Sequence, residues 1–471
     1  MRQALFNAVL AAALVGTTAL GGRAAAQVPH FHKVFTDKTA LFDASHYKQS
    51  MVTTSTNIFS VVDSTVGVML TKMDLSGNVV WTHLLGDSRT TAPTLIVGVD
   101  DSLILGTQSV TYDAAVVSKI DPGTGNVLWS KRYDKLEELI TLTQRGNRYV
   151  AMGNSYYGNN RMKPLAISIK DSDGSVAWAK QYLEVTASYA SDYDHRIKDA
   201  TVNPNTIVYT GIFYDGVNIS AARPRVTMLT IDAATGNVPP GTMHGYDVSW
   251  PATGDPLETD TGYEWDIADV KMDSGVMYGF ILAGTYPLGP GYGAPAMVRV
   301  NQDGVVLWAK LYRSSNSTSG FGRTARQSEF FNAGRLDFYT SWDFYRNAID
   351  GTGTASGLMR LNESDGSVVG MTVYDAPGWY AGLSMHSDGA GGYLLHNSED
   401  TYPAHSFELL KVGQIGGNVT CTAEDTTLTT QALTVTDLSI ALVSPSIPVD
   451  PADMPLLWVD RTLTVTDCAC P

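Results

Sequence analysis

The chain has 471 residues, a formal net charge of −15 and 17% charged residues, with 44 glycines and 23 tyrosines. Its negative charge argues against nucleic acids and anionic membrane surfaces as partners, since both are bound through basic patches. Sparse charge with abundant Gly, Tyr, Thr and Val is typical of an all-β protein whose strands are joined by tight turns.

Residues 1–26 have the pattern of a secretory signal peptide. Arg2 gives a basic start, residues 4–20 are mostly apolar, and residues 24–26 form an all-alanine cleavage site before Gln27. The apolar stretch is interrupted and short for a membrane anchor, and no later segment is long and apolar enough to cross a bilayer. We therefore expect a mature protein that is secreted, periplasmic or on the cell surface.

From residue 27 to 420 one pattern recurs: an alternating apolar run, a polar turn that ends in Gly, then Val and often Trp. Its clearest copies are residues 73–81 and 119–129. The turn glycines are Gly77, Gly125, Gly174, Gly236, Gly304, Gly366 and Gly417. Repetition of this kind indicates one supersecondary unit copied around or along an axis. We predict a β-propeller of seven four-stranded blades, with an open solenoid as the alternative.

Four units carry Trp at the same distance after the turn glycine: Trp81, Trp129, Trp178 and Trp308. A large apolar residue repeated at one strand position is best explained by packing between adjacent blades. The first strand-like text, residues 31–35, parallels residues 129–133 of a complete unit. We expect this N-terminal strand to pair with the last blade and close the ring.

These units resemble the tryptophan-docking repeats of PQQ-like propellers, whose pattern is Asp-x-x-Thr-Gly-x-x-x-Trp. Asp121, Thr124, Gly125 and Trp129 match it fully, whereas the unit of Gly236 matches only its first half. The resemblance, which extends to secreted bacterial propellers of unknown role, implies blade architecture and no activity. A PQQ-dependent dehydrogenase would also need a cofactor cavity and typically two adjacent cysteines, and this chain has no Cys before residue 421.

The intervals between turn glycines are longest from Gly174 to Gly366, so blades three to six should carry the added loops. In a propeller these loops, between strands two and three or between blades, share one face, where binding commonly resides. The aromatic residues that we predict to bind a ligand there are Tyr156, Tyr157, Tyr214, Trp250, Trp265, Tyr292, Trp342, Tyr345 and Trp379. Their amphipathic rings suit glycans, peptides or proteins. Packing of the loops onto one another is the alternative.

One of these loops is acidic and is the candidate for a metal. Its carboxylates are Asp255, Glu258, Asp260, Glu264 and Asp266. Ca²⁺ takes six to eight oxygen ligands, so it is the cofactor that this cluster suggests, although the spacing matches no EF-hand loop. The short turns at residues 171–174 and 363–366 also look calcium-like, but turn propensity explains them.

Catalytic motifs are missing from the sequence. No metal-ligand histidine spacing, nucleophile elbow, phosphate loop or dinucleotide fingerprint appears, so no catalytic residue is assigned. We therefore expect a non-catalytic propeller that binds a glycan, peptide or envelope protein through its long aromatic loops. A propeller hydrolase or lyase acting on polysaccharide, and a structural component of a surface layer, are the alternatives.

Residues 421–471 change in character and contain all three cysteines, Cys421, Cys468 and Cys470. Alternating Thr and Val predict two to four strands in a C-terminal β-rich tail, either docked on the propeller or forming a small module. In an exported chain, a disulfide of Cys421 with Cys468 or Cys470 would tie this tail down.

Overall fold

The computed structural model is all-β. It describes residues 31–36, 42–43, 50–64, 67–85, 90–109, 114–157, 161–184, 196–198, 206–215, 223–249, 265–271, 277–289, 292–314, 321–322, 327–331, 335–343, 355–374, 380–387, 392–399, 406–412, 423–425, 428–432, 434–439, 442–443, 447–449, 451–454, 458–462 and 464–467. Within these residues, no helix reaches the length and hydropathy that a membrane crossing requires.

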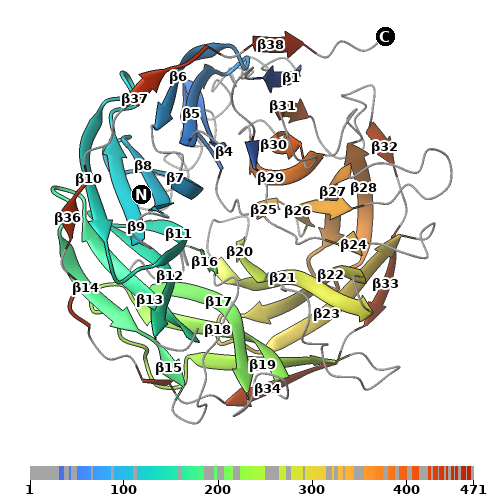
Figure 1. Cartoon of the computed structure of the whole chain (residues 1–471). Coiled ribbons are helices and arrows are strands. Elements are labelled where there is room, and N and C mark those ends of the chain that lie inside the picture. The colour runs from blue at the N-terminus through green and yellow to red at the C-terminus, as the bar shows by residue number, and fades with distance from the viewer. Residues whose placement is uncertain are drawn as a thin grey trace, which may run out of the picture.

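Antiparallel sheets stand around a central axis (Figure 1). The first contains β2 (Phe42–Asp43), β3 (Met51–Thr53), β4 (Asn57–Ser64), β5 (Gly67–Asp74), β6 (Val79–Leu85) and β37 (Trp458–Asp460). The second contains β7 (Thr90–Val97), β8 (Leu103–Ser109), β9 (Ala114–Ile120), β10 (Val127–Tyr133) and β36 (Ala452–Asp453). The third contains β11 (Glu138–Arg145), β12 (Arg148–Tyr157), β13 (Arg161–Lys170) and β14 (Val176–Gln181), followed by the pair β15 (Leu183–Glu184) and β35 (Leu442–Val443).

The next sheets continue around the ring. One contains β16 (Arg196–Lys198), β17 (Thr206–Asp215), β18 (Arg223–Asp232), β19 (Met243–Ser249) and β34 (Thr434–Ser439). Another contains β20 (Trp265–Lys271), β21 (Met277–Gly289), β22 (Tyr292–Asn301), β23 (Val306–Ser314) and β33 (Leu428–Ala432). Then come β24 (Phe321–Gly322), β25 (Gln327–Phe331), β26 (Arg335–Asp343), β27 (Ala355–Asn362), β28 (Val368–Tyr374) and β32 (Ala423–Asp425). The last sheet contains β29 (Tyr380–Ser387), β30 (Tyr393–Glu399), β31 (Ser406–Val412), β1 (Phe31–Thr36) and β38 (Thr464–Asp467).

The ring closes on itself. The innermost strands contact one another in the order β3, β7, β11, β16, β20, β25 and β29, and β29 contacts β3 again. The N-terminal strand β1 pairs with β31 of the last sheet, with Phe31 opposite Lys411, so the expected closure is confirmed. The all-β propeller is confirmed as well. The expected count of seven blades stays a prediction, because several connections between sheets lie outside the described residues.

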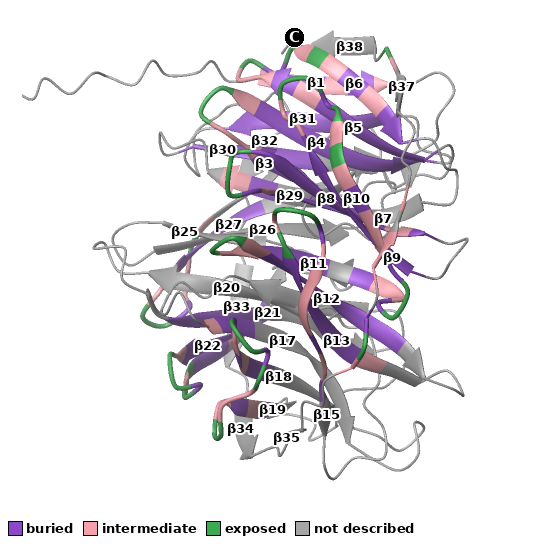
Figure 2. Cartoon of the chain, turned by 90° about the vertical axis from the view of Figure 1, so that its left-hand side faces the viewer, coloured by how far each residue is buried: buried purple, intermediate pink, exposed green. Residues whose placement is uncertain are grey.

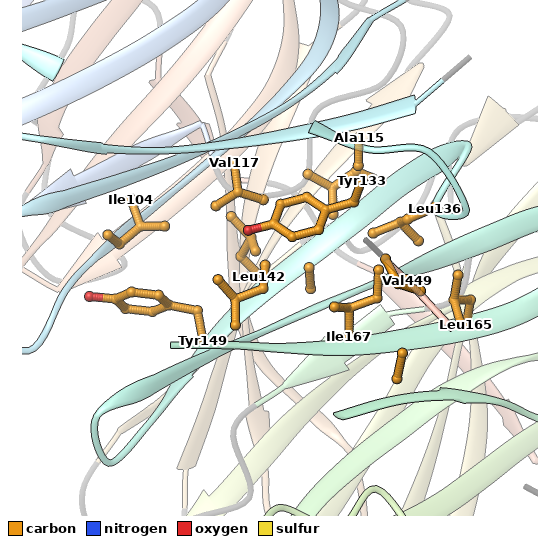
Figure 3. Packing of buried hydrophobic residues seen from close by; sticks show 14 of the residues in the cluster. Ile104, Ala115, Val117, Tyr133, Leu136, Leu142, Tyr149, Leu165, Ile167 and Val449 are labelled. Atoms are coloured by element: carbon orange, nitrogen blue, oxygen red, sulfur yellow. The ribbon is translucent and has the colours of Figure 1, made fainter. Parts of the chain in front are cut away.

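The core lies between neighbouring sheets rather than in one central mass, and the strand interiors are buried while the turns are exposed (Figure 2). Between the β7–β10 and β11–β14 sheets, Ile104 and Val117 face Leu142 and Ile167 in one apolar cluster (Figure 3). Each inner strand therefore packs apolar side chains against the next sheet. This rigid frame positions the two faces of the ring.

The C-terminal tail forms no separate module. Its strands, β32 to β38, each pair with a strand of the ring and lie along its outside, where Figure 1 shows them in red. The sequence predicted two to four strands there, and the structure describes seven short ones. Short strands escaped prediction because their hydrogen-bonding partners lie far away in the sequence. The residues predicted to form a signal peptide and the three cysteines lie outside the described residues.

Candidate binding face

Long hairpins distinguish one side of the ring. The hairpins β12–β13, β17–β18 and β21–β22 continue to the pairs Tyr157 opposite Arg161, Asp215 opposite Arg223, and Gly289 opposite Tyr292. The strands β12, β13, β17, β18 and β22 have 10 residues each and β21 has 13, whereas β8 and β9 have 7. Since each of these hairpins joins the second and third strands of its sheet, they all rise on the same face. These three hairpins therefore project from the same face of three consecutive sheets.

Five of the predicted aromatic residues lie at the ends of such hairpins. The strand pairing places Tyr156, Tyr157, Tyr214, Tyr292 and Trp342 in the last pairs before each hairpin loop. Trp265 begins β20 opposite Gly284, at the same end of its sheet. These residues come from four neighbouring sheets. The sequence position of each insertion was therefore enough to gather them on one face.

Of the other predicted site residues, Asp266 alone lies within the described residues. Trp250, Tyr345 and Trp379 lie outside the described residues, as do Asp255, Glu258, Asp260 and Glu264 of the acidic loop. Asp266 is in β20, opposite Ala283. Among the residues that the structure describes, no group of three or more His, Cys, Asp or Glu could hold a metal ion. Calcium at the acidic loop stays a prediction.

A carboxylate is held on this same face, and sequence reasoning missed it. Glu138 is the first residue of the innermost strand β11, and its Oε2 accepts a hydrogen bond of 2.8 Å from the Nδ2 of buried Asn154. On the outer side of the same sheet, Gln181 of β14 donates through Nε2 to the Oγ of Ser155 at 2.9 Å. Glu138 is half-buried, so the bond fixes its orientation while leaving it partly accessible. Acidic residues are too common in this chain for sequence alone to single it out.

The opposite face carries the turn glycines and serves packing. The Nε1 atoms of Trp81, Trp129, Trp178 and Trp308 each donate to a backbone carbonyl in the corresponding turn of the next sheet, at 3.3, 2.9, 3.1 and 2.8 Å. The turn glycine sits directly against this indole: a Cβ on Gly174 would lie 3.0 Å from the Trp129 ring, and one on Gly366 would lie 2.7 Å from that of Trp308. The tryptophans therefore join adjacent sheets.

The calcium-like turns are also accounted for by structure. Asp173 Oδ1 accepts the backbone N–H of Ser175, and Asp365 Oδ1 accepts that of Ser367, each at 2.9 Å. These backbone hydrogen bonds hold the pKa of both exposed carboxyl groups below its ordinary value. The carboxylates thus stabilise their own turns.

A second repeated contact joins the sheets and was not found in the sequence. The hydroxyls of Tyr133, Tyr182, Tyr246 and Tyr312 each donate to the carbonyl of the next turn glycine, at 2.7, 3.1, 2.7 and 2.9 Å. All four tyrosines are fully buried. The signal was present, because Tyr recurs at a fixed distance after Gly125, Gly174 and Gly304, but the alignment of units stopped at the Trp. We call these four contacts the tyrosine latches.

Comparison with known proteins supports the fold and stops there. No family profile matches the chain, and no curated protein resembles it in sequence. A polysaccharide lyase described as an ulvan lyase superposes with a TM-score of 0.51 and 8% identity, over 80% of this chain and 95% of the lyase. An ulvan lyase bound to a GlcA(1-4)Rha3S saccharide gives 0.49 at 8% identity, over 82% and 96% of the chains. The quinohemoprotein alcohol dehydrogenase from Comamonas testosteroni gives 0.42 at 12% identity, over 79% and 75%.

Proposed function

We propose that this chain is an exported propeller that binds a polysaccharide across the face of its long hairpins. The observation that carries the proposal is the position of Tyr156, Tyr157, Tyr214, Tyr292 and Trp342 at the ends of hairpins from four neighbouring sheets. Aromatic rings offer a flat apolar surface with a polar edge, which suits the faces of sugar rings. A row of them over consecutive sheets suits an extended chain of sugars better than a small molecule.

The charge of the chain narrows the class of polysaccharide. A net charge of −15 repels polyanions and attracts neutral or cationic polymers. We therefore place neutral and amino-sugar polysaccharides ahead of sulfated or uronic-acid polymers. A peptide or an envelope protein is the alternative partner for the same surface.

Binding to a panel of neutral, cationic and anionic polysaccharides tests the proposal. Tyr157→Ala and Trp342→Ala should each weaken binding about tenfold, because the stacking of one flat group on an aromatic side chain contributes on the order of 1–3 kcal/mol. Leu128→Ala is the matched control, since Leu128 is 56% exposed on the outer strand β10, away from the hairpin ends. Unchanged binding in both hairpin variants, or no binding to any member of the panel, would refute the proposal.

Cleavage of the polysaccharide is a second candidate, favoured by the held carboxylate of Glu138. A carboxylate fixed by Asn154 at the start of an innermost strand could transfer a proton to or from a sugar chain bound above it. In that case the protein cleaves a bound polysaccharide and new polysaccharide ends appear. Glu138→Gln should abolish this cleavage, whereas Glu137→Gln should retain it. If the full-length protein binds a polysaccharide without producing new polysaccharide ends, the cleavage proposal is refuted and the binding proposal stands.

A further inference from the structure

The tail keeps a constant register along the ring. Its pairing places Asp425 opposite Thr372, Ala432 opposite Lys310 and Ser439 opposite His244, on successive outer strands β28, β23 and β19. Further on, Asp453 lies opposite Lys131, Asp460 opposite His83 and Asp467 opposite Lys33, on β10, β6 and β1. Each move to the next of these outer strands advances the tail by seven residues, and the step from 439 to 453 spans two sheets. Between these two positions, Leu442 and Val443 pair with Glu184 and Leu183 of β15, the short strand that follows β14 in the chain.

Backbone hydrogen bonds repeat with the same period. The amides of Ile447, Met454 and Arg461 donate to the carbonyls of Ala179, Ser130 and Thr82, at 3.3, 3.3 and 3.0 Å. These three acceptors are equivalent, because each directly follows a tryptophan that joins sheets: Trp178, Trp129 or Trp81. Every seventh residue of the tail therefore donates a backbone hydrogen bond to the equivalent carbonyl of successive sheets.

Apolar residues follow the period too. Val449 is 8% exposed and belongs to the cluster between the β7–β10 and β11–β14 sheets, where it lies near Leu136 and Leu165 (Figure 3). Ile447 packs partly buried against the same cluster. Counting by sevens from Val449 reaches only apolar residues on either side: Leu428, Val435, Leu442, Leu456 and Leu463.

We propose that residues 423–467 carry a seven-residue repeat, one step for each sheet, that works as a belt closing the propeller. The belt begins on the β28 sheet, passes around the outside of the ring and ends on the neighbouring sheet, beside β1 (Figure 1). There β1 is paired on both edges, by β31 and by β38. Both ends of the described chain are thus bonded into one sheet, and the ring opens only when the belt is released. A blade number other than the number of repeats would leave the belt out of register.

Hydrogen exchange on the full-length protein tests the register directly. The amides of Ile447, Met454 and Arg461 should be protected together, at least about 100-fold over an unstructured peptide, because all three are bonded to the ring. Exchange of these amides at the rate of an unstructured peptide would overturn the belt.

A shift of register gives a second, independent measurement. One serine inserted after residue 450 moves the remaining repeats off their partners, whereas one serine added after residue 471 changes the composition equally and leaves the register intact. We expect the internal insertion to speed unfolding in denaturant about tenfold or more, since several backbone hydrogen bonds are lost together. Equal unfolding rates of the two variants would refute the requirement for a seven-residue step.

A pair of point variants separates the belt from general surface effects. Val449→Ser removes a buried apolar contact, and Pro448→Ser changes the exposed neighbouring residue. The first should raise the exchange of the Ile447 and Met454 amides and the second should leave it unchanged. Identical exchange in the two variants would show that the apolar period does not hold the tail in place.

Discussion

The tyrosine latches allow a quantitative test of how the sheets are held together. Tyr133 is 0% exposed and its hydroxyl donates to the Gly174 carbonyl at 2.7 Å, across the junction of two sheets. Tyr133→Phe keeps the ring in place and removes only this donor. Loss of one partner of a buried hydrogen bond costs about 1–3 kcal/mol. With about 2.1 cal/mol/K of unfolding entropy per residue, a ring of about 400 residues should melt about 1–4 °C lower.

Urea denaturation measures this cost most directly. The midpoint should fall with an unchanged slope, because the variant exposes the same surface on unfolding. Tyr312→Phe acts at a separate junction, where its hydroxyl bonds Gly366 at 2.9 Å, so the double variant should lose the sum of the two single effects. An unchanged midpoint in both single variants would refute the latch. Binding to a polysaccharide should be unaffected, because the latches end at the turns on the opposite face.

Three further predictions follow from the described contacts. Gly125→Ala should destabilise the protein more than Gly146→Ala, because both glycines have positive φ but a Cβ on Gly125 would collide with the His83 ring, whereas one on Gly146 would meet nothing within 4 Å. Equal melting temperatures of the two variants would contradict this prediction. Burial lowers the pKa of His396 from 6.5 to about 3, so below pH 6.5 the unfolded chain binds a proton that the folded chain does not. The free energy of unfolding should therefore fall as pH drops below about 6.5, by up to about 1.4 kcal/mol per pH unit. His396→Gln should reduce this acid-side decrease, which melting temperatures measured over a series of pH values would show. Mass spectrometry without reductant should find Cys421 linked to one of the two C-terminal cysteines, and a bond between those two instead would refute the predicted pairing.

The buried tyrosines predict how stability changes at alkaline pH, and this dependence provides a control for the effect of His396 at acid pH. Burial raises the pKa of Tyr133, Tyr182 and Tyr312 above the ordinary value of 10.0. The unfolded chain therefore loses these protons first, and their contribution to stability is complete below about pH 10 and declines above it. His396→Gln should leave this alkaline decline unchanged.

Much of the architecture was readable from local sequence. The turn glycines and the tryptophans mark the turn between the third and fourth strands of each unit and the fourth strand itself, because Gly125 and its equivalents need positive φ and the strands alternate with period two. The N-terminal strand expected at residues 31–35 is β1, Phe31–Thr36. Local rules suffice where a residue's conformation depends on its near neighbours. The same rules located the insertions and therefore the face on which Tyr157 and Trp342 lie.

What only the tertiary structure decided are the contacts between units. Tyr133 and Gly174 belong to different units, and Asp453 and Lys131 are more distant still, so no local rule pairs them. The carboxylate of Glu138 is a candidate functional group only because Asn154 on the neighbouring strand holds it by a hydrogen bond. The tail shows the difference most clearly: its seven-residue period is present in the sequence, but a period of seven has no meaning until a ring supplies one binding position for each repeat. Sequence determined the repeating unit and its faces, and the closed ring determined which distant residues meet.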